Sequence, residues 1–358
     1  MLAIITRDGQ HVPLDCEDYC IVHNWNGWED TVQFSLPRGH PQMRLLAERV
    51  RLAEKTEGQV YALTSINTGK NSTAYVAKLD LDSLCTTLLT DWNNYVKTGW
   101  FSKGPQTMAD TVRRAISGLT GWELTAPDKD TDKLAIEQFN GTPLELIQKA
   151  VDVWKNYPVR FTVPSSGSCQ MAVVDPSTRK LCGTYFTDEL NLLEQPYFKG
   201  KAETGDGYYT ALHLAGKGCS VEVKNHDYDA RIIWHYESDS SISAQSALKI
   251  KADSMVKAAA APKRSYSCKA ADLSRLQPER YQHLTFGLYD KVVLMDRDRQ
   301  TNSTVQIAQY TVYPHRPENN AVQLNSVAGK ISSTSKSYSG DVIQYTDPDE
   351  TEDKNADP

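Results

Sequence analysis

The chain has 358 residues, of which 40% are hydrophobic and 23% charged, the composition of an ordinary globular protein with room for several domains. This composition argues against a disordered chain. No window approaches the roughly eighteen consecutive apolar residues of a membrane-spanning helix, and residues 1–8 lack the basic and apolar regions of a signal peptide. We therefore expect a chain that is made and folded in a cytoplasm and has no membrane anchor.

The net charge of −6 is concentrated at the C-terminus. Residues 347–358 hold six acidic residues and one lysine, which gives −5 and leaves −1 for the rest of the chain. The basic surface typical of nucleic-acid-binding proteins is therefore not expected. The acidic end is predicted to be solvated or ordered by a partner.

The first eighty residues have the pattern of a small β unit. Asp8-Gly9 joins two short apolar runs and favours a tight hairpin, because glycine accepts positive φ. Pro41 opens a short helix that carries Leu45 and Leu46. Turn-forming residues separate further strands, which are expected at 31–36, 50–54, 59–66 and 73–79. Residues 1–80 are predicted to form a first β-barrel domain.

A helical pattern after residue 80 indicates a second domain. Apolar residues recur at helical spacing over 81–95, and two capped helix starts follow at 107–110 and 142–145, the second with Pro143 at the first helical position. Short strands are expected at 122–124, 160–163 and 171–174, and they would give the helices a sheet to pack on. Residues 81–175 are predicted to form an α+β inset domain.

The last third of the chain combines strands with one longer helix. Residues 209–215 alternate weakly, and an extended pattern resumes at 220–224 after a glycine-containing break. Ser241 can cap a helix that Pro262 ends. The apolar stripe of this helix is Leu248, Ala252, Met255 and Ala259. Further strands are expected at 264–270, 291–295 and 305–313.

The order of these motifs resembles the baseplate hub proteins of tailed phages, a family whose longer members are named tail-associated lysins or prophage tail endopeptidases. The segment T-A-L-H-L-A-G at 210–216 is similar to the family's T-R-L-Y-P-Y-G without its arginine. After the helix, P-K-R-S-Y-S-C-K-A-A-D-L at 262–273 is similar to P-x-x-S-Y-x-x-x-x-x-D-L, and G-L-Y-D-K-V-V-L-M-D at 287–296 to L-G-D-x-V-x-V-x-D. The likeness extends over most of the chain, and its motifs are folding signatures, none of them catalytic.

This resemblance implies an α+β, mainly β fold that forms rings and contains two small β-barrel domains similar to those of tail tubes. The second barrel would be split into 176–231 and 283–330 around a helix-containing insert at 232–282. An acidic C-terminal tail at 331–358 would follow. Removal of the insert should then leave a foldable β unit.

The resemblance also implies a structural virion protein, a homotrimeric hub at the distal end of a phage or phage-derived tail. Its partners would be copies of itself, the tail tube or distal tail protein, other baseplate or tip proteins and a tape-measure protein. DNA would pass through during ejection without specific binding. The protein would be made in the cytoplasm of the bacterial host and located in the virion, at the tail tip or baseplate, and no cofactor is expected.

Two other classes of function are open: a tail-associated enzyme that degrades cell wall, and a carbohydrate-binding tip protein. Cys169, Cys219 and His213 have the residue types of a nucleophile and base. Cys169, however, precedes a predicted strand with no histidine near it, and in the family the degrading domain follows the hub portion, so we expect no catalytic residue and no enzyme. Trp25 and Trp28 could stack on sugars if both were exposed in one concave patch, whereas their burial would argue against sugar binding.

Metal-ligand residue types occur in three short windows, none with a complete set. Cys16 and Cys20 lack a second pair. His226–Asp229 with His235 match no zinc spacing, and the glycine and glutamate of a calcium loop are misplaced at 128–132. No metal site is therefore expected. The seven cysteines are odd in number and scattered, which predicts thiols rather than a disulfide framework.

Overall fold

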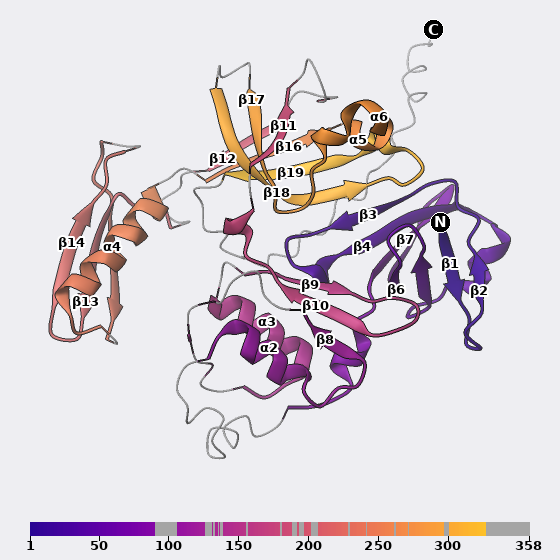
Figure 1. Cartoon of the computed structure of the whole chain (residues 1–358), viewed down its shortest axis with the longest axis horizontal. Coiled ribbons are helices and arrows are strands. Elements are labelled where there is room, and N and C mark those ends of the chain that lie inside the picture. Colours follow the sequence, from indigo (N-terminus) through magenta and orange to yellow (C-terminus); the bar gives the residue numbers. More distant parts are fainter. Residues whose placement is uncertain are drawn as a thin grey trace, which may run out of the picture.

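The computed structural model describes residues 1–89, 106–125, 131, 133–134, 136, 139–154, 157–179, 181–187, 192, 197–201, 207–227, 230–240, 242–260, 263–270, 272–296 and 301–326. Most of the regular secondary structure in the described chain is β-strand, arranged in one thirteen-stranded sheet and two three-stranded sheets (Figure 1). The predicted mainly β, α+β class is confirmed. No helix in the described parts is long and apolar enough to span a membrane, and the acidic tail lies outside them.

The N-terminal half of the long sheet runs in the order β3-β4-β7-β6-β5-β1-β2. These strands are β1 (Leu2–Ile5), β2 (His11–Pro13), β3 (Tyr19–His23), β4 (Thr31–Pro37), β5 (Arg51–Glu54), β6 (Gln59–Thr68) and β7 (Ser72–Leu79). The hairpin predicted at Asp8-Gly9 joins β1 to β2, and Gly9 has a φ of 79°. The four predicted strands are confirmed as β4 to β7, and the helix predicted at Pro41 is the 3₁₀ turn η2 (Pro41–Leu45). Strand β3 was not predicted, although its residues 19–22 form a short apolar run.

Strict alternation along β4 shows why these segments form a sheet with one buried face. Val32, Phe34 and Leu36 are buried, while the residues between them are exposed. On the buried face Phe34 stacks on Tyr75 of β7, with ring centroids 5.0 Å apart. Such cross-strand pairs fix the register, because a slip of one residue would move every apolar side chain to the solvent face.

The C-terminal half continues the same sheet in the order β12-β16-β19-β18, with β17 and β11 paired beyond β18. Its strands are β11 (Leu181–Phe186), β12 (Tyr197–Lys201), β16 (Lys263–Lys269), β17 (Lys291–Asp296), β18 (Thr301–Val312) and β19 (Ala321–Ser326). The two halves join where Tyr310, Thr311 and Val312 of β18 pair antiparallel with β3. The pairings among the described strands make one open sheet and close no barrel, so the expected pair of closed barrels is corrected. Alternation along a strand encodes which face is buried, but it does not encode which edges meet.

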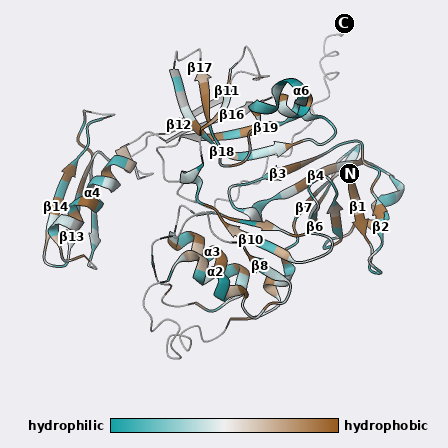
Figure 2. Ribbon diagram, viewed as in Figure 1, coloured by the Kyte–Doolittle hydropathy of each residue, from teal (hydrophilic) through white to brown (hydrophobic). Residues whose placement is uncertain are grey.

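The inset consists of the sheet β8-β10-β9 and two helices that cover it (Figure 1). Its elements are α2 (Met108–Ile116), β8 (Trp122–Leu124), α3 (Pro143–Trp154), β9 (Val159–Thr162) and β10 (Cys169–Val173), close to their predicted positions. Figure 2 shows both hydrophobic and hydrophilic residues along α2 and α3, as expected of helices that cover a sheet. Thr142 and Glu145 form the predicted capping box, with Thr142 N donating to Glu145 Oε2 at 2.7 Å. The buried residues of the inset belong to the same hydrophobic core as those of the long sheet.

The helix predicted over 81–95 is not found in its described part. Asp82–Cys85 is a short 3₁₀ turn (η3), and Leu89 instead forms an isolated bridge with Gly141. Leu88, which the predicted stripe would bury, is 68% exposed. Residues 90–95 lie outside the described residues.

A separate lobe follows β12 in the chain and stands apart from the rest in Figure 1. It consists of β13 (Ala211–Gly216), β14 (Ser220–Lys224), β15 (Trp234–Asp239) and α4 (Gln245–Ala260). Leu212 and Leu214 of β13 pack with α4 in a hydrophobic cluster of its own. The predicted stripe of α4 is confirmed, with Leu248 and Ala252 fully buried, whereas Ser241 lies outside the described residues.

The lobe is inserted into a β-hairpin of the long sheet. Lys201, the last residue of β12, pairs with Lys263, the first residue of β16, in an antiparallel ladder. The expected division is therefore corrected at both ends. Residues 211–224 belong to the lobe rather than to the second β unit, and β16 belongs to the long sheet rather than to the insert. The sequence of a short strand does not indicate whether it joins the sheet of the lobe or the long sheet.

Candidate functional site

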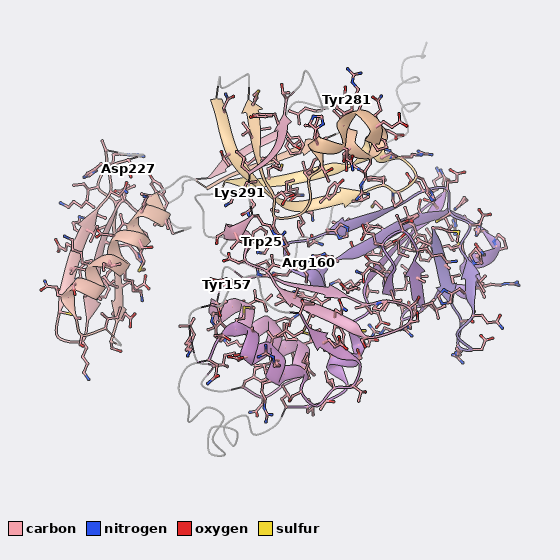
Figure 3. The ribbon with its side chains drawn as sticks, viewed as in Figure 1. Trp25, Tyr157, Arg160, Asp227, Tyr281 and Lys291 are labelled. Atoms are coloured by element: carbon pink, nitrogen blue, oxygen red, sulfur yellow. The ribbon has the colours of Figure 1, made fainter. Side chains whose placement is uncertain are left out.

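The main body of the protein has three parts: the N-terminal half of the long sheet, its C-terminal half and the inset. They meet at a buried polar junction. It is built from the end of β3, the following loop with the 3₁₀ turn η1 (Gly27–Glu29), strand β9 of the inset, and the turn before β17. Figure 3 shows Trp25 and Arg160 in this region, between the C-terminal half of the long sheet and the inset helices. This junction is the candidate functional site, because buried charged and polar side chains connect all three parts there.

Asp30 lies at the centre of the junction with a side chain only 5% exposed. Its carboxylate accepts from Arg160 Nη2 at 2.5 Å and Nη1 at 3.0 Å, and from the backbone N of Asn24 at 2.8 Å. Arg160 also donates to the carbonyl of Asn24 at 2.9 Å. Burial lowers the pKa of Arg160, but the charge of Asp30 outweighs burial and raises it. Arg160 therefore stays charged, and its bidentate contact with Asp30 joins the inset to the N-terminal half of the sheet.

His23 lies beside this pair, between two carboxylates. Its Nδ1 is 3.3 Å from Asp30 Oδ2, and its Nε2 is 3.0 Å from Glu57 Oε1. Burial lowers the pKa of His23, but the hydrogen bonds and charges of Asp30 and Glu57 outweigh burial and raise it to about 9. The imidazole is therefore charged at neutral pH, and together with Arg160 it balances the two carboxylates.

The C-terminal half of the sheet reaches the same loop through Tyr289. Its hydroxyl donates to the carbonyl of Trp25 at 2.5 Å, and its ring meets the indole edge to face with centroids 4.9 Å apart. Tyr289 has a φ of 72°, a left-handed conformation that is rare for an aromatic residue. Gln309 adds a hydrogen bond from Nε2 to Asn24 Oδ1 at 2.6 Å. Tyr289 and Gln309 of the C-terminal half and Arg160 of the inset thus contact the same loop after β3.

Close packing on the inset side explains the glycine in Trp25-Asn26-Gly27-Trp28. A Cβ added to Gly27 would lie 2.9 Å from Phe161 Cδ2 and 3.0 Å from the carbonyl oxygen of Val159. Trp28 also faces Phe161, with ring centroids 6.5 Å apart. Trp25 and Trp28 are both half-buried and face different parts of the chain, so they do not form the concave sugar-binding patch considered above.

The candidate nucleophiles and base are not assembled into a catalytic pair. His213 Nδ1 contacts Glu222 Oε1 at 3.1 Å, and the sulfur of Cys219 contacts the carbonyl of Ser243 at 3.5 Å. Burial and the nearby charge of Asp80 raise the pKa of Cys169, which favours the thiol over the nucleophilic thiolate.

The candidate metal windows also lack a complete set of ligands in the described parts of the chain. These parts contain no cluster of three or more His, Cys, Asp or Glu residues that could hold an ion. Burial raises the pKa values of Cys16 and Cys20 to about 11, which favours their thiol forms. Asp229 of the His226–Asp229 window lies outside the described residues, as do Asp128, Asp130 and Asp132.

The whole fold is similar to solved phage tail proteins. The 43 kDa tail protein of prophage MuSo2 from Shewanella oneidensis aligns with a TM-score of 0.61 at 9% identity, covering 92% of this chain and 98% of that one. Prophage tail protein gp18 from Listeria monocytogenes EGD-e aligns at 0.58 and 12% identity, covering 90% and 94%. The tail protein from Neisseria meningitidis MC58 aligns at 0.57 and 10% identity, covering 91% and 96%.

Comparison by sequence finds similarity over a smaller part of the chain. No curated protein matches the chain. Residues 217–335, which include most of the lobe and strands β16 to β19, match the model of the prophage endopeptidase tail family. The chain therefore has the fold of phage tail proteins, and the resemblance to the prophage tail endopeptidase family that its motifs predicted is confirmed.

Proposed function

We propose that this protein is a structural, non-enzymatic component of a phage or phage-derived tail, a trimeric hub that joins the tail tube to the baseplate or tip. The observation that carries the proposal is the likeness to three tail proteins over at least nine-tenths of this chain and of theirs. Its partners would be copies of itself, the tube or distal tail protein and other baseplate proteins, with a tape-measure protein in the channel.

The architecture supports a geometric role. Two β units are joined edge to edge through β3 and β18 into one sheet, and the inset shares their core. A ring of three such chains would present six β units, which suits a connection between a sixfold tube and a threefold tip. The Asp30–Arg160 ion pair and the hydrogen bonds of Tyr289 and Gln309 would together hold the inset and the two β units at a fixed angle.

Charge supports passage of DNA through such a ring. Without residues 347–358 the chain has a net charge of −1. A channel that grips DNA would need many lysine and arginine contacts to phosphate, each of which would slow passage. A nearly neutral body is compatible with transit without specific binding.

Solution mass and low-resolution images of the purified protein test the proposal. We expect a threefold ring with an open axis and a mass near three times 40.0 kDa. A chain that stays monomeric at all concentrations, with no rings in the images and no binding to tail tubes, would contradict the hub. Release of fragments from purified cell wall would instead favour the enzyme named in the family description.

A further inference from the structure

The lobe carries an exposed aromatic face that its own fold does not use. Trp234 is 48% exposed and Tyr236 is 65% exposed, and the neighbouring Ile232 is 49% exposed. Strand register pairs Trp234 with Ala211 and Tyr236 with His213. These residues therefore lie on the face of the sheet opposite Leu212 and Leu214, which pack on α4.

This lobe face is ordered by contacts within the lobe. The ammonium of Lys224 lies 5.5 Å from the centre of the Trp234 ring. The imidazole of His213 stacks on the Tyr236 ring with centroids 5.5 Å apart, and its Nδ1 contacts Glu222. Because β15 is one of the two edge strands of the three-stranded sheet, the rings of Trp234 and Tyr236 lie at the border of the lobe. Rigid, amphipathic aromatic side chains of this kind are typical of interface centres.

A second exposed apolar face lies on β11 at the border of the long sheet. Leu181 is 52% exposed and Tyr185 is 46% exposed. Their register partners on β17, Lys291 and Val293, share this face, while Phe186 and Leu294 lie on the buried one. Leu181, Tyr185, Lys291 and Val293 define the β11 face.

The two faces are complementary in character. Each presents exposed aromatic and aliphatic side chains. The lobe face carries the carboxylate of Glu222, 61% exposed, as well as the cation Lys224. The β11 face carries the cation Lys291, whose Nζ also donates to the carbonyl of Ser177 at 2.9 Å. None of the four residues that define the β11 face is acidic. Apolar contact with one pair of opposite charges at its border is the usual anatomy of a specific protein interface.

The lobe leaves the β11 face of its own chain uncovered, because Leu181 and Tyr185 remain 52% and 46% exposed. Only residues 261 and 262 separate the end of α4 from the start of β16. Three Cα–Cα steps span at most about 11 Å, whereas β11 lies four strands beyond β16 in the sheet, roughly 19 Å away at the usual strand spacing. In Figure 1 the lobe also stands well away from β11. A neighbouring copy is not restricted by this short connection.

We propose that the lobe face of one copy docks on the β11 face of the next copy. The contact is heterologous, because it joins two different surfaces, and such a contact makes a closed ring when the rotation between copies closes. The proposal rests on the self-assembling hub described above and names the surfaces that would hold neighbouring chains together.

Paired variants test the contact directly. Trp234→Ser with Tyr236→Ser removes the lobe face, and Leu181→Ser with Tyr185→Ser removes the β11 face. We expect each double variant to weaken self-association at least tenfold, measured by sedimentation equilibrium, because central aromatic residues dominate interface affinity. Ile250→Ser, at a 72% exposed position on α4, and Leu276→Ser, at a 39% exposed position on α5 (Leu273–Leu276), are matched controls that should leave association unchanged.

Mixing the two double variants distinguishes a heterologous contact from a symmetric one. Each variant keeps one intact face, so an equimolar mixture should form a species of one chain of each kind and go no further. Circular dichroism of each variant checks that it is folded. A trimer that persists in both variants would overturn this inference and leave the hub proposal standing. A wild type that stays monomeric at all concentrations, forms no rings and binds no tail tubes would contradict both.

A photo-crosslinking amino acid at position 236 gives a readout that does not depend on loss of assembly. In a mixture of isotopically light and heavy chains, we expect crosslinks from position 236 of one chain to residues 181–186 of another. Crosslinks confined to one chain, or directed elsewhere, would overturn the proposal. An unchanged ring combined with loss of binding to purified cell-wall polysaccharide in the lobe variant would also overturn it, and would assign the face to a sugar.

Discussion

Asp30 and Arg160 form an ion pair that is largely buried. Their side chains are 5% and 23% exposed, and they come from the N-terminal half of the sheet and from the inset. A buried pair adds little net stability compared with apolar residues of the same shape, but loss of one partner leaves a charge buried without compensation. The junction is therefore expected to be sensitive to single substitutions.

Arg160→Met tests this sensitivity. The variant keeps an extended apolar side chain but leaves the Asp30 carboxylate without its cation, so we expect a loss of about 3 kcal/mol in the free energy of unfolding, measured by denaturant titration. Arg113→Met is the control, because Arg113 and Asp110 form a pair whose side chains are 59% and 40% exposed. Such pairs contribute about 0–1 kcal/mol. Equal losses in the two variants would contradict a central role for the junction.

His23 makes stability depend on pH in a defined direction. Its folded pKa of about 9 lies above its ordinary value of 6.5, so the folded state holds the proton more tightly than the unfolded state. The resulting stability is fully present below pH 6.5 and is lost as pH rises through 9. Arg160, Asp30 and Glu57 are the charged groups that face the ring.

The variant His23→Gln should lose this pH dependence. Between pH 6.5 and 9 we expect the wild type to lose stability relative to the variant, with a slope of at most about 1.4 kcal/mol per pH unit for one proton. Unfolding titrations of both proteins at pH 6, 7.5 and 9 measure the difference. Parallel pH profiles would show that His23 does not hold a proton in the folded junction.

At the scale of elements, the junction depends on how closely η1 approaches β9. Gly27 lies against Val159 and Phe161 with no room for a Cβ, and two of the three nearest atoms belong to the backbone. A backbone contact cannot relax by rotation of a side chain. A larger residue at this position must therefore move η1 away from the inset.

Gly27→Ala is expected to lower the free energy of unfolding by about 1–3 kcal/mol, the usual effect of overpacking. Gly118→Ala is a suitable control, because nothing lies within 4 Å of a Cβ there and no positive φ is involved. The control should change stability by less than about 0.5 kcal/mol. Thermal unfolding of the two variants compares them, and a neutral Gly27→Ala would mean that η1 can separate from β9 without loss.

At the scale of the whole molecule, the chain consists of a main body with one hydrophobic core and a lobe with another. The lobe enters and leaves through the paired residues Lys201 and Lys263, the position that a tight turn would occupy in an uninterrupted hairpin. A lobe with its own core, inserted at a hairpin end, should be removable without loss of the main sheet.

Replacement of residues 202–262 by Asn-Gly is therefore expected to give a soluble β protein, because this pair closes a two-residue hairpin. The structure also revises the deletion suggested by the sequence: removal of 232–282 would take away β16 together with part of the lobe, and should give insoluble protein. Removal of 286–312, which contains β17 and β18, is the matched disruptive control. Solubility and circular dichroism of the three variants compare them, and an insoluble 202–262 replacement would contradict independent cores.

The sequence by itself determined the local structure of this protein. The Asp8-Gly9 turn, the alternation along β4, the Thr142 capping box and the stripe of α4 all follow from interactions within a few residues, and each was predictable for that reason. The order of motifs in the C-terminal third also predicted the likeness to phage tail proteins.

Only the tertiary structure decided which edges and side chains meet. The pairing of β3 with β18 joins segments almost three hundred residues apart, and it makes one open sheet where the residue pattern and the family resemblance suggested two barrels. The junction of Asp30, Arg160 and His23 could not be predicted, because isolated polar residues give no sign of their distant partners. Likewise, Trp25 and Trp28 were recognisable as a feature, but their roles depend on Tyr289 and Phe161, which reach them only after folding. Local periodicity specifies buried faces, whereas pairing between distant segments depends on how all of these faces can be buried at once.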